Sequence, residues 1–431
     1  MPPKRSATIS KRTADPRYQK SVLENGIRVV SETIPYVRSV SLGVWADVGS
    51  RDELTDENGL SHFLEHMVFK GTRNRSTREI AQSLESLGGY LNAFTTKEQT
   101  CFYARVLDRH LPEAMDVLSD LVLNATFEKK ELEKEKRVVI EELKNAEDDP
   151  EDIIHDYFEN ALFPKHPLGW PVIGTVKNVK RFTRNDLKTY LDRYYHPEQL
   201  VIAAAGNLSH KDLKAFVAKA FRSMKGGKPL RERKAAPLTE QRKGEVTTYR
   251  RPIQQAHLCM GTVGFSLSHQ SRYALHLLNG ILGEGMSSRL YQSVREKHGL
   301  AYSVYSFASM LTDTGTVGVY AGTDDANVDH AIGLIQKEIN LLVKTRVRPD
   351  ELHRTKSQLK GSLMLGLESM SNRMMRLGGG ELHHEPYRTI DQILEKIDGV
   401  TARNVQEVAE QLFDRSGFST VIIRPEEQQR A

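Results

Sequence analysis

Residues 223–245 read SMKGGKPLRERKAAPLTEQRKGE, and this stretch divides the chain nearly in half. Its glycines, prolines and charged residues show almost no apolar periodicity, which is typical of a linker. A chain of 431 residues also exceeds the size at which one hydrophobic core usually keeps growing. We therefore expect two domains, residues 22–222 and 246–431, preceded by a basic N-terminal extension over residues 1–21.

Both halves carry the same order of patterns. Strand-like sequence precedes an apolar helical segment, GLSHFLEHMVF at residues 59–69 and YALHLLNGILGEG at residues 273–285. Two more strand-like runs and two helices follow in each half, and the charged helix around Glu131 recurs around Glu351. This repetition indicates a duplicated domain. Because strands and helices mix without strict alternation, we predict an α+β fold with helices on one face of each mainly antiparallel sheet.

The helical segment of the first half contains the pattern His-x-x-Glu-His. His62 and His66 are four residues apart, so on a helix they share one face and can chelate one ion. Glu65 stands beside the second histidine, where its carboxylate can take a proton from a nearby water. This order is the inverse of the His-Glu-x-x-His metallopeptidase signature. The alternative is an ordinary core helix whose histidines are satisfied by their neighbours, and a metal site still needs a third ligand.

The charged segment at residues 129–145, KKELEKEKRVVIEELKN, offers candidates for that ligand. Glu135 and Glu142 are two helical turns apart and share a face, while Leu132 and Val139 support an apolar face for packing. Either glutamate can supply an oxygen ligand. A solvated, charged helix is the alternative for this segment read alone.

Taken together, these segments resemble a known family. SHFLEH, the downstream Glu142 and the intervening GGYLNAFTTKEQTCFY are similar to the pitrilysin-type (inverzincin) zinc metallopeptidases. Within them the chain resembles the mitochondrial-processing-peptidase beta-subunit and its bacterial homologues, over nearly its whole length. The resemblance implies that His62, His66 and Glu142 bind one Zn²⁺ per chain and that Glu65 is the general base. It also implies that Glu135 orients a ligand through an outer hydrogen bond.

The second half carries a further family motif, VREKHGLAYSVYS, which places Arg295 and Tyr302 seven residues apart. In the family this pair holds the substrate and polarises the scissile carbonyl. The second half has LLNGILGEG where the first has SHFLEH, so it lacks the ligand set. In the processing-peptidase branch two chains associate as a clam shell. The Arg and Tyr of one chain then reach the zinc site of the partner chain. Since this chain has both motifs, the resemblance implies a homodimer. The alternative to a substrate role is a surface ion pair for Arg295 and an ordinary strand position for Tyr302.

Two segments bear on the peptide substrate. GGYLNAFTT reads as an edge strand that the family uses to bind an extended peptide by strand addition, which implicates Asn92 and Ala93; an internal strand is the alternative. DDPEDIIHDYF predicts a helix start that places Asp152 and Asp156 on one face. Matching acidic residues contact a substrate arginine in mitochondrial processing peptidase. A solvated helix N-terminus that favours acids is the competing account.

The stretch RMMRLGGGELHHEP near the C-terminus contains three consecutive glycines. It resembles the glycine-rich loop of the family's non-catalytic subunit. The end of a helix followed by a turn is the alternative interpretation.

Composition limits partners and compartment. The formal net charge of +5 is concentrated in residues 1–20 and 223–245, which lack interleaved aromatic residues, so we predict no nucleic-acid partner. No apolar run approaches the ~20 residues that span a bilayer, so no membrane insertion is expected. The N-terminus lacks the apolar segment of a secretory signal, which favours a bacterial cytoplasmic protein, or a mitochondrial matrix protein if the source is eukaryotic.

The sequence therefore predicts a zinc endopeptidase of unfolded or short peptides, with Glu65, His62, His66 and Glu142 at its centre. The alternative function is a structural or assembly subunit with the same fold and no peptidase activity. A complete ligand set argues against that alternative, because a scaffold has no physical need for it.

Overall fold

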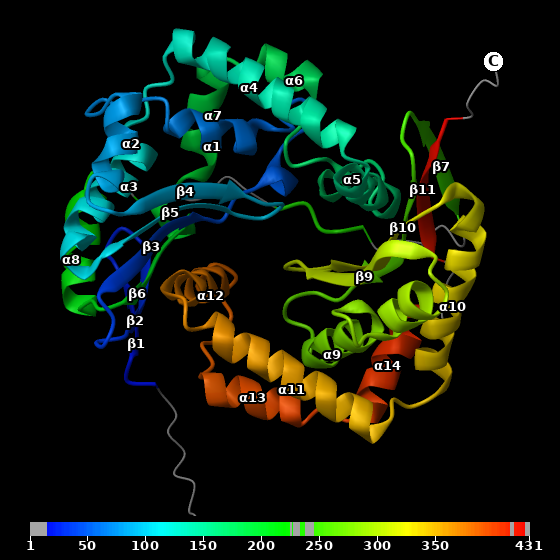
Figure 1. The fold of residues 1–431 in the computed structure, drawn as a ribbon. Helices are drawn as coiled ribbons and strands as arrows, with labels where there is room; N and C mark the ends of the chain where they lie inside the picture. Colours follow the sequence, from blue (N-terminus) through cyan, green and yellow to red (C-terminus); the bar gives the residue numbers. More distant parts are fainter. Residues whose placement is uncertain (1–14, 225, 227–232, 238–244, 414–417, 427–431) are drawn as a thin grey trace, which may run out of the picture.

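The computed structural model describes residues 15–224, 226, 233–237, 245–413 and 418–426, and Figure 1 shows them arranged around two β-sheets. The first sheet has six strands in the order β1-β2-β6-β3-β5-β4. Strands β2 and β6 are parallel, and the other neighbours are antiparallel. The strands are β1 (Tyr18–Val22), β2 (Arg28–Thr33), β3 (Ser39–Ala46), β4 (Tyr90–Thr95), β5 (Thr100–Leu107) and β6 (Leu200–Gly206).

The second sheet repeats this arrangement with five strands in the order β7-β11-β8-β10-β9. This order matches β2-β6-β3-β5-β4, including one parallel pair, β7 with β11. The strands are β7 (Val246–Arg251), β8 (Ala256–Gly264), β9 (Ala301–Met310), β10 (Gly315–Thr323) and β11 (Ser419–Pro425). The shared topology supports the duplication that the sequence predicts.

The helices of each half cover the outer face of their own sheet (Figure 1). On the first sheet these are α1 (Leu60–Val68), α2 (Thr77–Glu85), α3 (Leu111–Asn124), α4 (Lys129–Asp148), α6 (Val176–Arg181), α7 (Arg184–Tyr194) and α8 (His210–Ala220). On the second they are α9 (Arg272–Gly283), α10 (Val328–Lys344), α11 (Pro349–Gly366), α13 (Ile390–Asp398) and α14 (Ala402–Phe413). Short helical segments are η1 (Ser50–Asp52), η2 (Asp108–His110), η3 (Pro167–Gly169), η4 (Pro197–Gln199), η5 (Tyr291–Lys297) and η6 (Asp325–Asn327).

One helix of each half packs against the sheet of the other half. Helix α5 (Pro150–Leu162) packs Ile154 and Phe158 against Cys259 and Val421 of the second sheet. Helix α12 (Met370–Leu382) in turn packs against the first sheet. The two helices hold the same place in the order of their halves, each directly after the charged helix, so the exchange is reciprocal. The sheets therefore have helices on both faces, which corrects the expectation of helices on one face only.

The three consecutive glycines lie inside α12 rather than in a loop. A Cβ atom on Gly378 would lie 2.2 Å from the Nε1 of Trp45, so only glycine lets the helix approach the first sheet this closely. Gly379 and Gly380 continue the helix, which ends at Leu382. The glycine-rich-loop interpretation is therefore wrong, and the helix end comes two residues after the last glycine.

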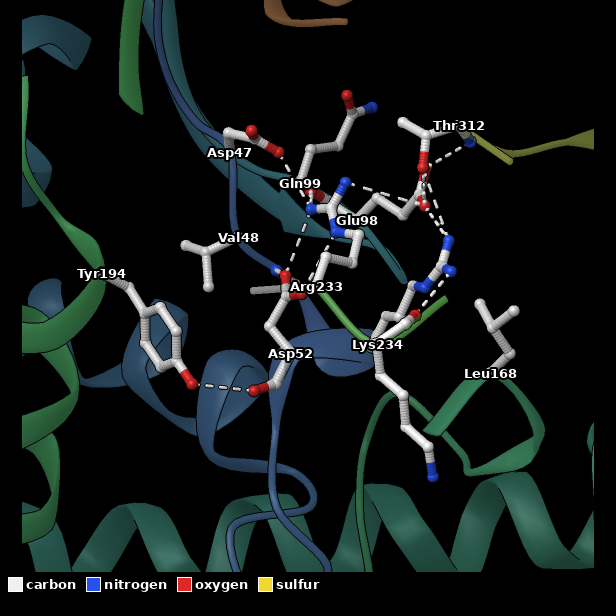
Figure 2. A network of polar contacts seen from close by, with 12 residues as sticks. Asp47, Val48, Asp52, Glu98, Gln99, Leu168, Tyr194, Arg233, Lys234 and Thr312 are labelled. Atoms are coloured by element: carbon white, nitrogen blue, oxygen red, sulfur yellow. Dashed lines mark hydrogen bonds and ion pairs between the residues drawn. The ribbon is translucent and has the colours of Figure 1, made fainter. Parts of the chain in front are cut away.

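The predicted extension and linker lie partly outside the described residues. Residues 1–14 and most of residues 223–245 are not described. Residues 18–21 of the predicted extension belong to β1, which pairs with β2. Within the linker, Arg233 is fixed by ion pairs to Asp47 at 2.9 Å and Asp52 at 3.2 Å (Figure 2). The linker is therefore anchored to the first half at this point.

A network of polar side chains joins the two halves beside Arg233 (Figure 2). Arg51, only 1% exposed, pairs with Glu98 at 2.5 Å and with Asp313 at 2.7 Å. Glu98 lies in the β4–β5 turn, and its carboxylate also accepts hydrogen bonds from the backbone N–H and hydroxyl of Thr312, in the β9–β10 turn. The two hairpins that carry the edge strands are therefore tied together at their tips.

Replacing Arg51 by methionine is expected to lower the free energy of unfolding by about 3 kcal/mol, because a buried carboxylate then loses its principal cation. Urea unfolding monitored by circular dichroism measures the change. The matched control is Arg38→Met, which breaks a pair with Asp108 whose arginine is 83% exposed. That loss should cost only about 0–1 kcal/mol. Equal costs for the two variants would contradict the role given to Arg51.

Candidate metal centre

Helix α1 is held at its N-terminus by a buried carboxylate. Glu53, 2% exposed, accepts hydrogen bonds from the backbone N–H groups of Gly59 (2.8 Å) and Ser61 (2.7 Å). Burial raises the pKa of Glu53 to about 8, and these hydrogen bonds oppose the rise. Phe63 and Leu64 are fully buried in the core of the first half. The helix is thus fixed in position and rotation, with its two histidines only partly exposed.

His62, His66 and Glu142 come together between α1 and α4. Each offers one ligand atom, and the three atoms lie within 4.8 Å of one another. The Nε2 atoms of His62 and His66 lie 3.8 and 3.6 Å from the carboxylate oxygens of Glu142. Ligand atoms in a tetrahedral zinc site are separated by about 3.4 Å, given bonds of about 2.0–2.2 Å. The donor set therefore fits a zinc ion after small side-chain movements.

Glu135 fixes the orientation of His66. Its carboxylate, on a side chain 5% exposed, lies 2.9 Å from Nδ1 of His66 and 2.8 Å from Nζ of Lys70. Because a carboxylate accepts hydrogen bonds, Nδ1 carries the proton and Nε2 is left facing Glu142. Burial lowers the pKa of His66, but the hydrogen bond to Glu135 and the nearby carboxylates outweigh it, so the pKa stands above its usual value. Burial and His66 lower the pKa of His62 to about 4.

Glu65 lies beside the cluster and contacts the edge strand of the sheet. The hydroxyl of Thr95, the last residue of β4, donates a hydrogen bond of 2.6 Å to Oε2 of Glu65. Burial raises the pKa of Glu65, and the hydrogen bond from Thr95 opposes that rise. A carboxylate with a raised pKa is suited to proton transfer near neutral pH. Sequence reasoning missed Thr95, although it belongs to the GGYLNAFTT segment from which Asn92 and Ala93 were predicted.

Asn92 and Ala93 lie on β4, which the sheet order places at the edge of the first sheet, so the internal-strand alternative is wrong. The backbone N–H of Ala93 donates a hydrogen bond of 2.9 Å to the Asn92 side-chain oxygen. In the described residues β4 pairs with β5 alone. One edge of β4 is therefore open to a further strand.

Asp152 and Asp156 both lie on helix α5, but they differ in solvent exposure. The predicted helix start is confirmed: α5 begins at Pro150 and has Asp149 as its N-cap. Asp152 is exposed, whereas Asp156 lines a cavity of about 550 Å³ between α4 and α5. Burial raises the pKa of Asp156 to about 6, opposed by the charge of Lys97. No ion pair or hydrogen bond in the described residues connects either aspartate to the three clustered residues.

Arg295 and Tyr302 lie together at the edge of the second sheet. Arg295 stands on the π-helical segment η5 and Tyr302 on the edge strand β9. The guanidinium carbon of Arg295 is 4.9 Å from the ring centres of both Tyr291 and Tyr302, and Tyr302 is 79% exposed. Within the described part of the chain, no contact joins either residue to the cluster on α1 and α4.

The second half has no equivalent cluster among its described residues. When Glu131 is aligned with Glu351, Thr355 takes the place of Glu135 and Ser362 takes the place of Glu142. Thr355 packs against Gly280 of α9, whereas Glu135 contacts His66 of α1. The second half is therefore a repeat in which neither glutamate position of this helix holds a carboxylate.

A duplicated α+β fold with a His-x-x-Glu-His helix and a nearby glutamate is that of a zinc metalloprotease. Residues 28–176 match the insulinase domain (peptidase family M16), and residues 181–359 match the peptidase M16 inactive domain. The chain belongs to peptidase family M16. Zinc is accordingly its cofactor, and the sequence prediction of family and metal is confirmed.

Bacterial relatives extend the comparison over almost the whole chain. The uncharacterized zinc protease YmxG of Bacillus subtilis is 43% identical over 403 residues, covering 93% of this chain and 97% of the relative. The uncharacterized zinc protease SCO5738 of Streptomyces coelicolor is 40% identical over 411 residues, covering 94% and 89%.

Solved structures agree in fold. A protease from Helicobacter pylori superposes with a TM-score of 0.87 at 23% identity, covering 95% of this chain and all of that one. The peptidase M16 inactive domain from Pseudomonas fluorescens gives a TM-score of 0.89 at 21% identity, covering 96% and 100%. Among the helices of the described residues, none combines the length and apolar character needed to cross a bilayer.

Proposed function

We propose that this protein is a zinc-dependent endopeptidase that cleaves unfolded or short peptides. In this proposal His62, His66 and Glu142 hold one zinc ion per chain and Glu65 is the general base. The observation that carries it is the convergence of three ligand atoms within 4.8 Å beside a partly buried glutamate. Residues 22–222 would form the catalytic domain, and residues 246–431 the homologous domain without metal.

The chemistry divides between the metal and the side chains around it. Zinc, when bound, supplies a Lewis acid that promotes attack by water on a peptide carbonyl. Glu65 takes the proton of the attacking water and passes it to the leaving amine nitrogen. Glu135 keeps His66 in the tautomer whose Nε2 is free to bind the metal.

The open edge of β4 is the proposed peptide-binding element. A substrate in extended form would add as a strand, with the backbone N–H of Ala93 as one donor and the Asn92 amide displaced from it. Main-chain hydrogen bonds give affinity that depends little on substrate sequence. Asp152 and Asp156 would favour a basic residue in the substrate. A closed chamber would exclude folded proteins by their size.

The substrate pair Arg295 and Tyr302 is proposed to act on the zinc site of a second copy of this chain. Tyr302 is largely exposed, as expected for a side chain that meets a substrate outside its own fold. Its hydroxyl would donate a hydrogen bond to the carbonyl oxygen as negative charge develops there. Two chains facing each other as a clam shell would enclose the substrate. Because the relatives named above are bacterial, we place this activity in a bacterial cell, with the cytoplasm as the expected compartment.

Complementation between two inactive variants tests the dimer. We expect Glu65→Gln and Tyr302→Phe each to lose most cleavage of an unstructured, arginine-containing peptide that the zinc-loaded wild type cuts. Co-expressed in equal amounts, they should form mixed dimers that have about half of wild-type activity once isolated, because one of the two sites in each mixed dimer has both intact residues. Two affinity tags isolate the mixed dimer, and peptide hydrolysis is measured by mass spectrometry.

As the control, each variant is co-expressed in two differently tagged copies, which form a dimer of that variant alone. These dimers should be as inactive as the variant expressed by itself. An inactive mixed dimer would show that Tyr302 serves the site of its own chain. A fully active monomer in light scattering would remove the proposed dimer altogether.

A further inference from the structure

We propose that Thr95 is a positioning residue for Glu65 during peptide cleavage, an inference that rests on the function proposed above. Thr95 ends the edge strand β4, and its hydroxyl lies 2.6 Å from Oε2 of Glu65. No other hydrogen-bond donor reaches the Glu65 carboxylate in the described part of the chain. The Thr95 hydroxyl therefore determines which oxygen of the Glu65 carboxylate is engaged in a hydrogen bond.

The geometry of this hydrogen bond leaves the other carboxylate oxygen available. An ionised carboxylate only accepts hydrogen bonds, so the hydroxyl of Thr95 is the donor and Oε2 of Glu65 the acceptor. Oε1 is then the oxygen that can take a proton from the attacking water. A glutamate side chain has three rotatable bonds, and a fixed donor at one oxygen reduces the orientations that the base can adopt.

Thr95 is itself fixed because the turn after it is held by its neighbours. The backbone oxygen of Thr96 accepts a hydrogen bond of 3.1 Å from Ser50, and that of Lys97 accepts one of 2.8 Å from Arg51. Figure 2 shows the next residue, Glu98, within the buried network that joins the two halves. The donor thus stands on a rigid element, as precise orientation of a catalytic group requires.

The same strand connects the base to the proposed substrate. Ala93 and Thr95 are two residues apart, so their side chains share the face of β4 that meets α1. Ala93 offers its backbone at the open edge, and Thr95 holds Glu65. A peptide added to β4 is therefore placed in register with the residue that orients the base. We infer that Thr95 affects turnover rather than substrate binding.

The test compares Thr95→Val, which removes the donor, with Thr95→Ser, which retains it. We expect Thr95→Val to lower kcat by about 10- to 100-fold, by analogy with the loss of outer hydrogen bonds around a metal site, with KM unchanged. Thr95→Ser should recover most of that loss. The matched control is Thr100→Val: Thr100 pairs with Thr95 across the hairpin, but its hydroxyl bonds to the backbone oxygen of Val48. Its kcat should remain near that of wild type.

Two further measurements do not depend on cleavage. Zinc affinity, from competition with a chromogenic chelator, should be the same in Thr95→Val as in wild type. In a Glu65→Gln background, which does not cleave, adding Thr95→Val should leave the Kd of a fluorescent peptide unchanged. A Thr95→Val variant with wild-type kcat, a loss confined to KM or Kd, or no recovery in Thr95→Ser would each overturn the proposal.

Failure of this inference is distinguishable from failure of the proposed function. If wild type cuts no peptide, or if Glu65→Gln cuts as well as wild type, the peptidase mechanism itself is wrong. If wild type is active, Glu65→Gln is inactive and Thr95→Val equals wild type, only the role of Thr95 is wrong.

Discussion

Replacing Glu65 by glutamine should abolish peptide cleavage while leaving one zinc ion in each chain. Glutamine has nearly the shape of glutamate and can still accept the hydrogen bond from Thr95, but it cannot take a proton from water. Loss of a general base typically costs about 10²- to 10⁴-fold in rate. Hydrolysis of an unstructured, arginine-containing peptide gives kcat, and atomic absorption of the same sample gives the zinc content.

The matched control for this substitution is Glu141→Gln. Glu141 stands next to Glu142 on α4, but its side chain is 66% exposed and pairs with Lys144. The change of charge is the same, and we expect kcat to stay near the wild-type value. A Glu65→Gln variant that keeps its zinc and cuts as fast as wild type would rule out Glu65 as the base. Loss of zinc from that variant would instead make Glu65 a ligand.

Replacing Glu142 by glutamine should remove zinc and activity together. In the proposed site Glu142 supplies the third ligand atom, and without its charge two histidines are left to hold the ion. We expect zinc affinity to fall by more than the about 10- to 100-fold typical of a lost outer hydrogen bond. Competition with a chelator measures the affinity, and thermal unfolding with and without zinc measures the stabilisation that bound metal provides.

The Glu135→Gln variant shows which of the two glutamates of α4 contributes more to zinc affinity. One carboxylate oxygen of Glu135 contacts Nδ1 of His66, the ring nitrogen that faces away from Glu142. The other oxygen contacts Nζ of Lys70. Its loss should weaken zinc binding by only about 10- to 100-fold. If Glu135→Gln lost zinc more completely than Glu142→Gln, the assignment of ligand and outer partner would be reversed.

Much of the candidate site could be predicted because its elements are local. The spacing of His62, Glu65 and His66 places them correctly on any α-helix, and the two-turn separation of Glu135 and Glu142 puts both on one face of α4. Spacing alone did not choose between those glutamates; the resemblance to the family did. In the structure Glu142 faces both histidines and Glu135 lies behind His66.

Other features could not be predicted because they join residues far apart in the chain. Thr95 meets Glu65 across 30 residues, and Arg51 meets Asp313 across 262. The local pattern around Thr95 is that of a strand end, and nothing in it indicates a partner on α1. Gly378 of α12 is likewise explained only by the tertiary structure, where Trp45 leaves no room for a Cβ atom.

The sequence by itself determined the duplication and the helix that carries His62, Glu65 and His66, because hydrophobic period and residue spacing depend on the backbone geometry of one segment at a time. The family followed from the resemblance of the linked motifs. The tertiary structure decided which helices cross to the opposite sheet, how the two hairpin tips are tied and which side chain donates a hydrogen bond to Glu65. These choices depend on close packing between segments far apart in the chain, and on buried charges finding partners. Such contacts exist only after distant segments have folded together, within the first half for Thr95 and Glu65 and between the halves for the others.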